Sequence, residues 1–302
     1  IAILMVIMDM SGLSGVYAGE LDERQDKRET HSSPNMPGFQ KGLVNSSTTF
    51  DVASQHACAI LSDGGLYCWG DGSAYALGRG NTTDSQLPVP ATLPSGLTAE
   101  HISLGEYGRS CVLLSNSSVW CWGDYYPAGN PTSSSNPVPA MVPLDSTAVL
   151  VESSNEHSCA ILSNGSVQCW GNNYHGQLGV GYTCEYDVGD CRSEAADGYL
   201  ETPVYAALPT GSTAVGLNLW NHNTCVILAN TSYYCFGDYW NSPWPIIKQT
   251  GIAAADRNYL LKSDQTLMFY SFYTTTNGWQ EQGCWRPASN DTASCQTPPS
   301  ST

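Results

Sequence analysis

The residues with the clearest chemistry in this sequence are its cysteines, because their number and spacing predict a set of disulfides. There are twelve of them. In four pairs the two members lie ten residues apart, and the remaining four cysteines form two local pairs. The six pairs are Cys58/Cys68, Cys111/Cys121, Cys159/Cys169, Cys225/Cys235, Cys184/Cys191 and Cys284/Cys295. The two-residue separation that is usual between zinc-binding cysteines does not occur. The pattern therefore indicates a disulfide framework and an oxidising compartment.

A group of histidines is the second candidate for chemistry. His56, His157 and His222 each precede the first cysteine of a ten-residue pair by two or three positions. Metal ligands must converge on one ion, whereas these histidines recur at the interval of the cysteines. We therefore expect a structural role, in which each bonds a backbone carbonyl of its own repeat.

Acidic side chains are concentrated between residues 181 and 201. Glu185, Asp187 and Asp190 make this segment a candidate for calcium, which prefers oxygen ligands. The spacing of an EF-hand is absent, however, and acidic loops are usually only solvated. We therefore expect no cofactor and no other metal, with calcium at these residues as the alternative.

Six Asn-x-Ser/Thr sequons indicate N-glycosylation. They begin at Asn45, Asn81, Asn116, Asn164, Asn230 and Asn290. Three of them fall at the same place between paired cysteines. A turn former explains the Asn there but not the Ser two positions later, so we expect glycans and a secretory route.

Aromatic residues outside the repeating pattern lie in the connections between repeats. They are Tyr125, Tyr126, Trp220, Tyr239, Trp240 and Trp244. Amphipathic rings are favoured at protein-binding and sugar-binding surfaces. These residues are therefore candidates for a contact surface, with ordinary loop packing as the alternative.

Motifs that would indicate catalysis are missing. The sequence has no Gly-x-Ser-x-Gly elbow, no phosphate-binding loop and no His-Glu-x-x-His. We therefore expect no enzyme and no catalytic residues. Paired carboxylates for glycoside hydrolysis need only proximity in space, so a secreted glycan-active enzyme stays as an alternative.

The elements that must position these residues belong to an internal repeat. Its four copies span residues 56–70, 109–123, 157–171 and 223–237. Each reads as an apolar strand, a turn around Asp or Asn, and a second strand that ends in an aromatic residue and Gly. The turn residues are Asp63, Asn116, Asn164 and Asn230. This predicts a β-hairpin whose cysteines face each other about 4.5–5.5 Å apart, a separation that a disulfide accepts. Each bridge is expected to contribute about 2–3 kcal/mol.

The spacing of the copies predicts a β-propeller. The first cysteines of successive copies lie 53, 48 and 66 residues apart, enough for one four-stranded blade each. A fifth copy, residues 259–270, has Tyr259 and Phe269 in place of the cysteines. Helical periodicity is nearly absent. The expected fold class is all-β: a β-propeller built from about five or more hairpin-based blades and stapled by disulfides.

The repeat resembles the regulator of chromosome condensation repeat. The third copy carries His-Ser-Cys-Ala-Ile, Asn-Gly, Cys-Trp-Gly and Asn-Asn-Tyr-His-Gly-Gln-Leu-Gly over residues 157–179. The resemblance extends over residues 50–278 and implies a propeller, often of seven blades, that serves as a protein-binding platform. The second and fourth copies lack Gly-Gln-Leu-Gly after Gly123 and Gly237. The paired cysteines suit secreted members of the family rather than nuclear ones.

Four parts of the chain can be distinguished. Residues 1–18 read as a signal peptide or a retained apolar segment, too short to span a bilayer. Residues 19–48 form an N-terminal extension, residues 49–278 the propeller, and residues 279–302 a Pro/Ser/Thr-rich tail with one local disulfide.

The net charge of −16 makes nucleic acid and anionic membranes poor partners. The sequence indicates a non-enzymatic extracellular glycoprotein, secreted or at the cell surface, that acts as a structural subunit of a cell-surface or fibrous assembly or as a contact platform. A secreted receptor or inhibitor of one protein or glycan is the alternative.

The expected partners are other copies of the chain, other extracellular proteins, or glycans. An open ring of blades would expose sheet edges that a neighbouring chain could pair by strand donation. The alternative is that residues 36–50 or the Cys284/Cys295 loop closes the ring within one chain.

Overall fold

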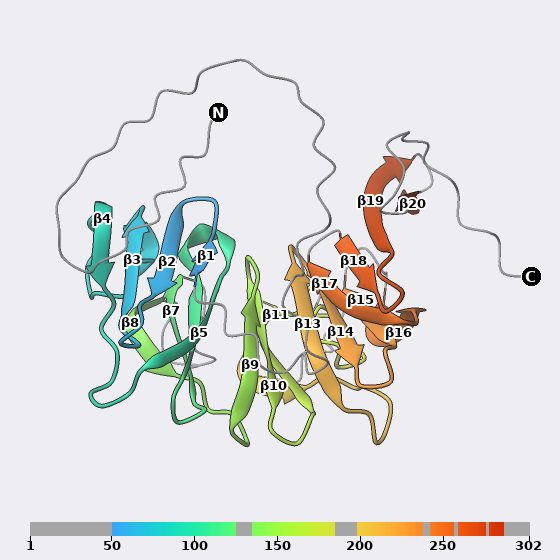
Figure 1. Cartoon of the computed structure of the whole chain (residues 1–302), viewed down its shortest axis with the longest axis horizontal. Helices are drawn as coiled ribbons and strands as arrows, with labels where there is room; N and C mark the ends of the chain where they lie inside the picture. Colours follow the sequence, from blue (N-terminus) through green and yellow to red (C-terminus); the bar gives the residue numbers. More distant parts are fainter. Residues whose placement is uncertain are drawn as a thin grey trace, which may run out of the picture. The chain divides into compact units, whose positions relative to one another are not determined.

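The computed structural model describes residues 50–124, 135–184, 198–237, 242–256, 259–275 and 278–286. All of them lie within one unit, residues 41–302. They form five four-stranded antiparallel sheets in which the strands follow one another in chain order. Each sheet is a meander of the kind that forms a propeller blade, and we number the blades one to five from the N-terminal end (Figure 1).

The strands follow the repeat closely. Blade one contains β1 (Phe50–Val52), β2 (His56–Ile60), β3 (Leu66–Gly70) and β4 (Ser85–Pro90), and blade two contains β5 (Ala99–Leu104), β6 (Ser110–Leu114), β7 (Val119–Asp124) and β8 (Ser135–Met141). Blade three contains β9 (Ala148–Ser153), β10 (His157–Leu162), β11 (Val167–Asn172) and β12 (Tyr199–Tyr205). Blade four contains β13 (Ala214–Trp220), β14 (Asn223–Leu228), β15 (Tyr233–Gly237) and β16 (Ser242–Gln249), and blade five contains β17 (Ile252–Asp256), β18 (Tyr259–Lys262), β19 (Leu267–Thr275) and β20 (Gly278–Arg286). The second and third strands of every blade are the hairpin that the repeat predicts.

The turn of each hairpin is built on the expected Asp or Asn. In the four cysteine-bearing repeats its side-chain oxygen accepts a hydrogen bond from the backbone N–H two residues later, over 2.9–3.1 Å. Blade five repeats this turn at Asp264, over 2.9 Å. Because a turn fixes the pairing of the strands it joins, this residue sets the register of all five hairpins.

The register places the two cysteines of each hairpin directly opposite each other, with Cα atoms 4.1 Å apart. The four predicted disulfides are present: Cys58–Cys68, Cys111–Cys121, Cys159–Cys169 and Cys225–Cys235. Cys184 is also disulfide-bonded, and its expected partner Cys191 lies outside the described residues. Cys284 lies in β20, and Cys295 is outside the described residues as well.

Adjacent blades pack by one recurring rule. The disulfide of a blade faces the next blade, where it shares a buried cluster with the aromatic residue that ends the next hairpin. The clusters join Cys58/Cys68 to Trp122, Cys111/Cys121 to Trp170, and Cys159/Cys169 to Phe236. All three rings are fully buried. These three aromatic residues therefore pack between blades.

The glycine after each aromatic residue is required by a close approach of two backbones. Gly171 has a φ of +104°, and a Cβ there would lie 2.4 Å from the backbone oxygen of Glu156. The equivalent Gly70, Gly123 and Gly237 have φ angles of +104° to +113° and similarly close backbone neighbours. No other residue type fits both the left-handed backbone and the missing space.

The outer strands have a feature that the sequence analysis did not use. Their sequences contain proline, at Pro88 and Pro90 of β4, Pro137 and Pro139 of β8, Pro203 of β12, and Pro243 and Pro245 of β16. Proline cannot donate to a further strand, so it protects an edge from pairing. The fifth sheet ends at Arg286, past residue 278, where we expected the propeller to end.

We predict that Gly171→Ala destabilises the protein far more than Gly96→Ala. Gly96 also has a positive φ of +80°, but a Cβ at that position would have nothing within 4 Å of it. Gly96→Ala should therefore show only the backbone cost of about 1–2 kcal/mol. Gly171→Ala must also displace the Glu156 carbonyl and should cost about 3 kcal/mol or more. Urea unfolding of both variants measures the difference, and equal losses would contradict the close approach.

Candidate contact site

The innermost strands carry a polar residue at one recurring register position. It is the residue paired with the first cysteine of each hairpin. These residues are Asp51, Ser103, Glu152 and Asn218. All four line one cavity of about 530 Å³, together with apolar residues of the same strands. Two carboxylates, a hydroxyl and an amide therefore share one site.

Three of these side chains join neighbouring blades. The Asp51 carboxylate accepts a hydrogen bond from the backbone N–H of Leu104 in blade two, over 2.7 Å. The Ser103 hydroxyl accepts one from the backbone N–H of Ser153 in blade three and donates one to the Glu152 carboxylate, both over 3.0 Å. The innermost strand has no strand neighbour on this side, so these bonds satisfy donors that would otherwise lack a partner in the fold.

His101 extends the same network. Its Nε2 lies 2.9 Å from the carbonyl oxygen of Val151 and 3.5 Å from a carboxylate oxygen of Glu152. Burial lowers the pKa of His101, but Glu152, the Val151 carbonyl and Asp51 together outweigh burial, and the net pKa is raised. Burial also raises the pKa of Asp51, against the opposing effect of its two backbone hydrogen bonds. The two carboxylates of the cavity and the nearby His101 imidazole are thus already engaged with one another and with the backbone.

The repeated histidines bond the next blade. His157 Nε2 lies 2.7 Å from the Thr224 hydroxyl of blade four, and that hydroxyl donates to the carbonyl oxygen of Gln177. Because Thr224 has one proton to donate, His157 must donate to it through Nε2. His56 Nε2 likewise lies 2.9 Å from the Ser110 hydroxyl of blade two. We expected these histidines to bond a backbone carbonyl of their own repeat. That expectation was wrong, because the Nε2 atoms of His56 and His157 each bond a hydroxyl of the next blade.

Both of these histidines are held neutral. Burial lowers the pKa of His56 to about 4. Burial, followed by the charges of Arg109 and His222, lowers the pKa of His157 well below its usual value. Arg109 occupies the equivalent position in blade two and is itself buried. Asn223 occupies the equivalent position in blade four. His222, the third histidine of the prediction, lies one residue before it.

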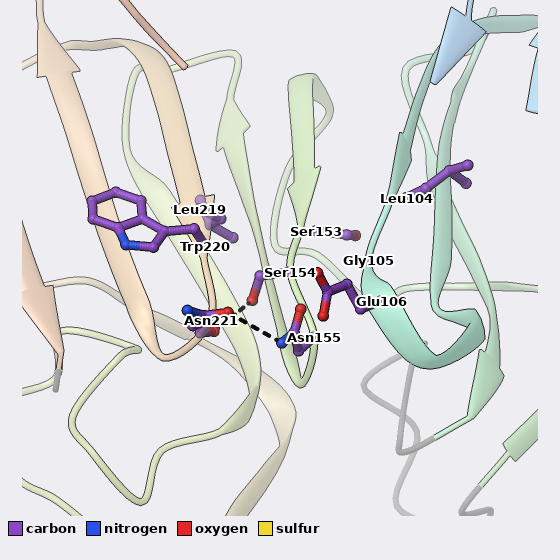
Figure 2. A pocket seen from close by; sticks show the side chains of 9 residues that line it. All are labelled: Leu104, Gly105, Glu106, Ser153, Ser154, Asn155, Leu219, Trp220 and Asn221. Atoms are coloured by element: carbon purple, nitrogen blue, oxygen red, sulfur yellow. Dashed lines mark hydrogen bonds between the residues drawn. The ribbon is translucent and has the colours of Figure 1, made fainter. Parts of the chain in front are cut away.

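A second, smaller pocket of about 200 Å³ opens where the innermost strands end (Figure 2). Equivalent loops of blades two, three and four form it. Its lining is Leu104, Gly105, Glu106, Ser153, Ser154, Asn155, Leu219, Trp220 and Asn221. The Glu106 carboxylate points across the pocket toward Asn155, whose amide donates to the Asn221 side chain over 3.3 Å (Figure 2). Tyr107, beside Glu106, is exposed. This pocket combines the Glu106 carboxylate with serine hydroxyls and two asparagine amides, which hold equivalent positions in blades three and four.

Of the predicted contact aromatics, Trp220 reaches this pocket. Its ring points away from Glu106 and Asn155 (Figure 2) and packs against the cluster that contains Ile252 and Leu260. Trp244 lies in β16, and its side chain is outside what the structure describes. The other four candidates, Tyr125, Tyr126, Tyr239 and Trp240, lie outside the described residues, as do the calcium candidates Glu185, Asp187 and Asp190.

The sequence analysis missed the polar position on the innermost strands. A signal for it exists, because Asp51, Glu152 and Asn218 each lie seven residues before the first cysteine of their repeat, and Ser103 lies eight before. Their side chains differ in type, so the position does not stand out as a motif. Asn155 and Asn221 each lie four residues before the first cysteine of their repeat, so they also recur, whereas Glu106 has no counterpart of the same type.

Neither a metal-binding cluster nor a membrane-spanning helix occurs among the described residues. In this part of the chain, no three His, Cys, Asp or Glu side chains are grouped so that they could bind a metal ion. The same residues include no helix of the length and hydropathy needed to cross a bilayer.

Comparison with known proteins identifies the repeat. Family models of the regulator of chromosome condensation repeat match residues 63–112 and residues 148–177. These two segments of the chain thus match the repeat of this family. The first match runs from the hairpin turn of blade one into β6 of blade two, and the second covers β9, β10 and β11 of blade three.

The relatives share repeats rather than overall length. A 72-residue stretch is 32% identical to the human E3 ubiquitin-protein ligase HERC2, which covers 24% of this chain and 2% of the ligase. A 68-residue stretch is 35% identical to the X-linked retinitis pigmentosa GTPase regulator homolog of Caenorhabditis elegans, covering 22% of this chain and 5% of that protein. The structure of human WBSCR16 is similar with a TM-score of 0.61 and 14% identity, over 72% of this chain and 60% of that one. This likeness shows the propeller fold alone.

We predict that acid removes a stabilising contribution of His56. Its folded pKa of about 4 lies below the ordinary 6.5, so the unfolded chain binds this proton first. The contribution is complete above pH 6.5 and is lost as the pH falls from 6.5 to about 4, by about 3 kcal/mol in total.

Denaturant unfolding of the native protein and of His56→Gln across this pH range measures the effect. The variant should lose less stability on acidification than the native protein. Their comparison separates His56 from His157, which acts in the same direction, and from His101, whose raised pKa acts in the opposite one. An NMR titration of His56 with a midpoint near 6.5 would contradict the prediction.

Proposed function

We propose that this protein is a non-enzymatic extracellular glycoprotein that acts as a contact platform and as a subunit of a larger extracellular assembly. One observation carries the proposal. The buried histidines of the repeat bond the next blade, whereas Glu106, Asn155 and Asn221 lie at least partly exposed around a pocket at the strand ends. Polar side chains on exposed loops that a rigid scaffold positions are suited to recognition.

The disulfides support an extracellular location. One bridge staples each of four hairpins, and such frameworks persist in oxidising compartments rather than in the cytosol. The bridges also face the packing between blades, so their reduction would weaken each blade and its contact with the next. A protein whose fold depends on them in this way suits secretion.

The sequons at the hairpin turns support glycosylation. Asn81, Asn116, Asn164 and Asn230 are all exposed. The hydroxyls of Ser118 and Ser166 donate to the side-chain oxygens of Asn116 and Asn164 over 2.6 Å. The serine therefore has a role in the turn, which the sequence analysis did not foresee. That role leaves the amide nitrogen, to which a glycan attaches, outside these hydrogen bonds.

The polar pocket supports recognition of a protein or glycan surface. Its loops present a carboxylate, two amides and two hydroxyls, with the exposed Tyr107 beside them. Such a mixture can hydrogen-bond peptide or sugar groups, and aromatic residues are enriched at interfaces of this kind. The receptor or inhibitor of a single partner that we considered from the sequence would use the same surface.

The glycan-active enzyme is the second candidate, because Asp51 and Glu152 line one cavity. Asp51 accepts backbone hydrogen bonds, and Glu152 is held by Ser103 and His101. These bonds give both carboxylates a part in joining blades, so we place binding ahead of hydrolysis.

We predict that Asn164 carries an N-glycan when the protein is made in a eukaryotic secretory host. Asn164→Gln and Ser166→Ala should each lose the mass of one glycan, whereas Ser166→Thr should keep it, because threonine completes the sequon. Mass spectrometry before and after glycosidase treatment makes the comparison. Retention of the chain inside the cell, or secretion with Asn116, Asn164 and Asn230 all unmodified, would contradict the proposal.

A further inference from the structure

The first blade presents a packing face that has no cover among the described residues. In blades two to four this face holds an apolar or small residue on the innermost strand, a leucine at the hairpin turn and the aromatic residue that ends the hairpin. In blade two these are Ile102, Leu104, Leu114 and Trp122, which are at most 7% exposed. They are buried because the disulfide face of blade one packs against them.

The equivalent residues of blade one are largely exposed. The strand registers align Phe50, Val52, Leu61 and Trp69 with those four residues of blade two. Phe50 is 53% exposed, Val52 49% and Leu61 45%. Trp69, whose counterparts are fully buried, is only half-buried and stacks on Phe50 with ring centroids 6.1 Å apart. We call these four residues the blade-one face.

A backbone donor on the same face also lacks its usual acceptor. Leu104 N–H and Ser153 N–H are each bound by the polar residue of the preceding blade. The equivalent N–H of Val52 is instead bound by its own neighbour Asp51, over 2.8 Å. Blade one is thus built for a preceding blade in both its apolar and its polar contacts.

Blade five presents the opposite half of the same interface. At the start of the third strand, blades one to four bury Leu66, Val119, Val167 and Tyr233 against the blade that follows, each at most 3% exposed. The equivalent residue of blade five is Leu267, which is 44% exposed. The register also places Asp256 at the position that Asp51 and Glu152 hold in their blades. The two ends of the array are therefore complementary by the rule that joins its interior blades.

We propose that the blade-one face binds the Leu267 side of blade five in a second copy of this chain. The contact is head-to-tail, so it propagates into a ring or a filament of copies. It rests on the proposed function as an assembly subunit and gives that assembly its interface. Stacking of faces replaces the strand donation expected from the sequence, because prolines occupy the outer strands of blades one to four, and only the outer strand of blade five among the described strands carries none.

We infer that a second copy covers the blade-one face, because one chain carries both sides of the interface. Large apolar side chains exposed to this extent and grouped on one face mark an interaction site. A partner that covered only one end would leave the other uncovered, whereas a copy of the same chain covers both. Residues 1–49 of the same chain are the other occupant that the test must separate.

The experiment uses the full chain and two charge substitutions at exposed positions, Val52→Glu and Leu267→Glu. Sedimentation equilibrium of the native protein should show a mass that rises with concentration. Each variant alone should lose this association. A mixture of the two variants should form a dimer and nothing larger, because the intact Leu267 side of the first variant meets the intact blade-one face of the second.

Met141→Glu is the matched control, because Met141 is 58% exposed on β8 of blade two, an interior blade that carries neither terminal face. It should associate as the native protein does, and all variants should unfold at the native denaturant midpoint. A native chain that stays monomeric at every concentration overturns the proposal and indicates that residues 1–49 cover the face. Association that survives in both variants, or that Met141→Glu also removes, overturns it as well. None of these outcomes alters secretion or the glycan at Asn164, which test the proposed function separately.

Discussion

The fold depends on the docking of one blade's disulfide face against the aromatic face of the next. A single hairpin of this length is marginally stable in water, and each blade has an apolar face that it cannot bury alone. The disulfide holds the two central strands in register, and it becomes part of the surface on which the Trp or Phe of the next blade lies. The glycine that follows the aromatic residue lets the strand approach the preceding loop closely enough for this contact. Turn, bridge, ring and glycine are thus parts of one interaction.

The same docking decides what the polar residues of the repeat can do. His56 and His157 are buried where two blades meet, so they are neutral and bonded to a hydroxyl of the next blade. Asp51, Ser103 and Glu152 satisfy backbone or side-chain partners on the neighbouring innermost strand. These His, Asp, Ser and Glu side chains, of types that often act in catalysis, therefore stabilise the contacts between blades. The loops at the strand ends and the two terminal faces are the surfaces that we propose for recognition.

The hairpins could be predicted because their signals are local. The ten-residue spacing about an Asx turn fixes which cysteines face each other, and the structure places Cys58 opposite Cys68 as expected. The role of the aromatic residues could be predicted from their period. The partner of His157 could not, since Thr224 is 67 residues away and the choice between blades depends on packing. The pocket at Glu106, Asn155 and Asn221 could not be predicted either, because it forms only where loops of three blades lie side by side, although the two asparagines hold the same position in their repeats.

The central claim is that repeat residues act across the contact between blades, and a double-mutant cycle on His157 and Thr224 tests it most directly. His157→Ala, Thr224→Val and the double variant are compared with the native protein by urea unfolding. The account predicts a coupling of about 1 kcal/mol or more, because each single substitution already removes the shared hydrogen bond. Losses that add to within about 0.3 kcal/mol would show that the two residues stabilise their own blades independently. That result would contradict the account.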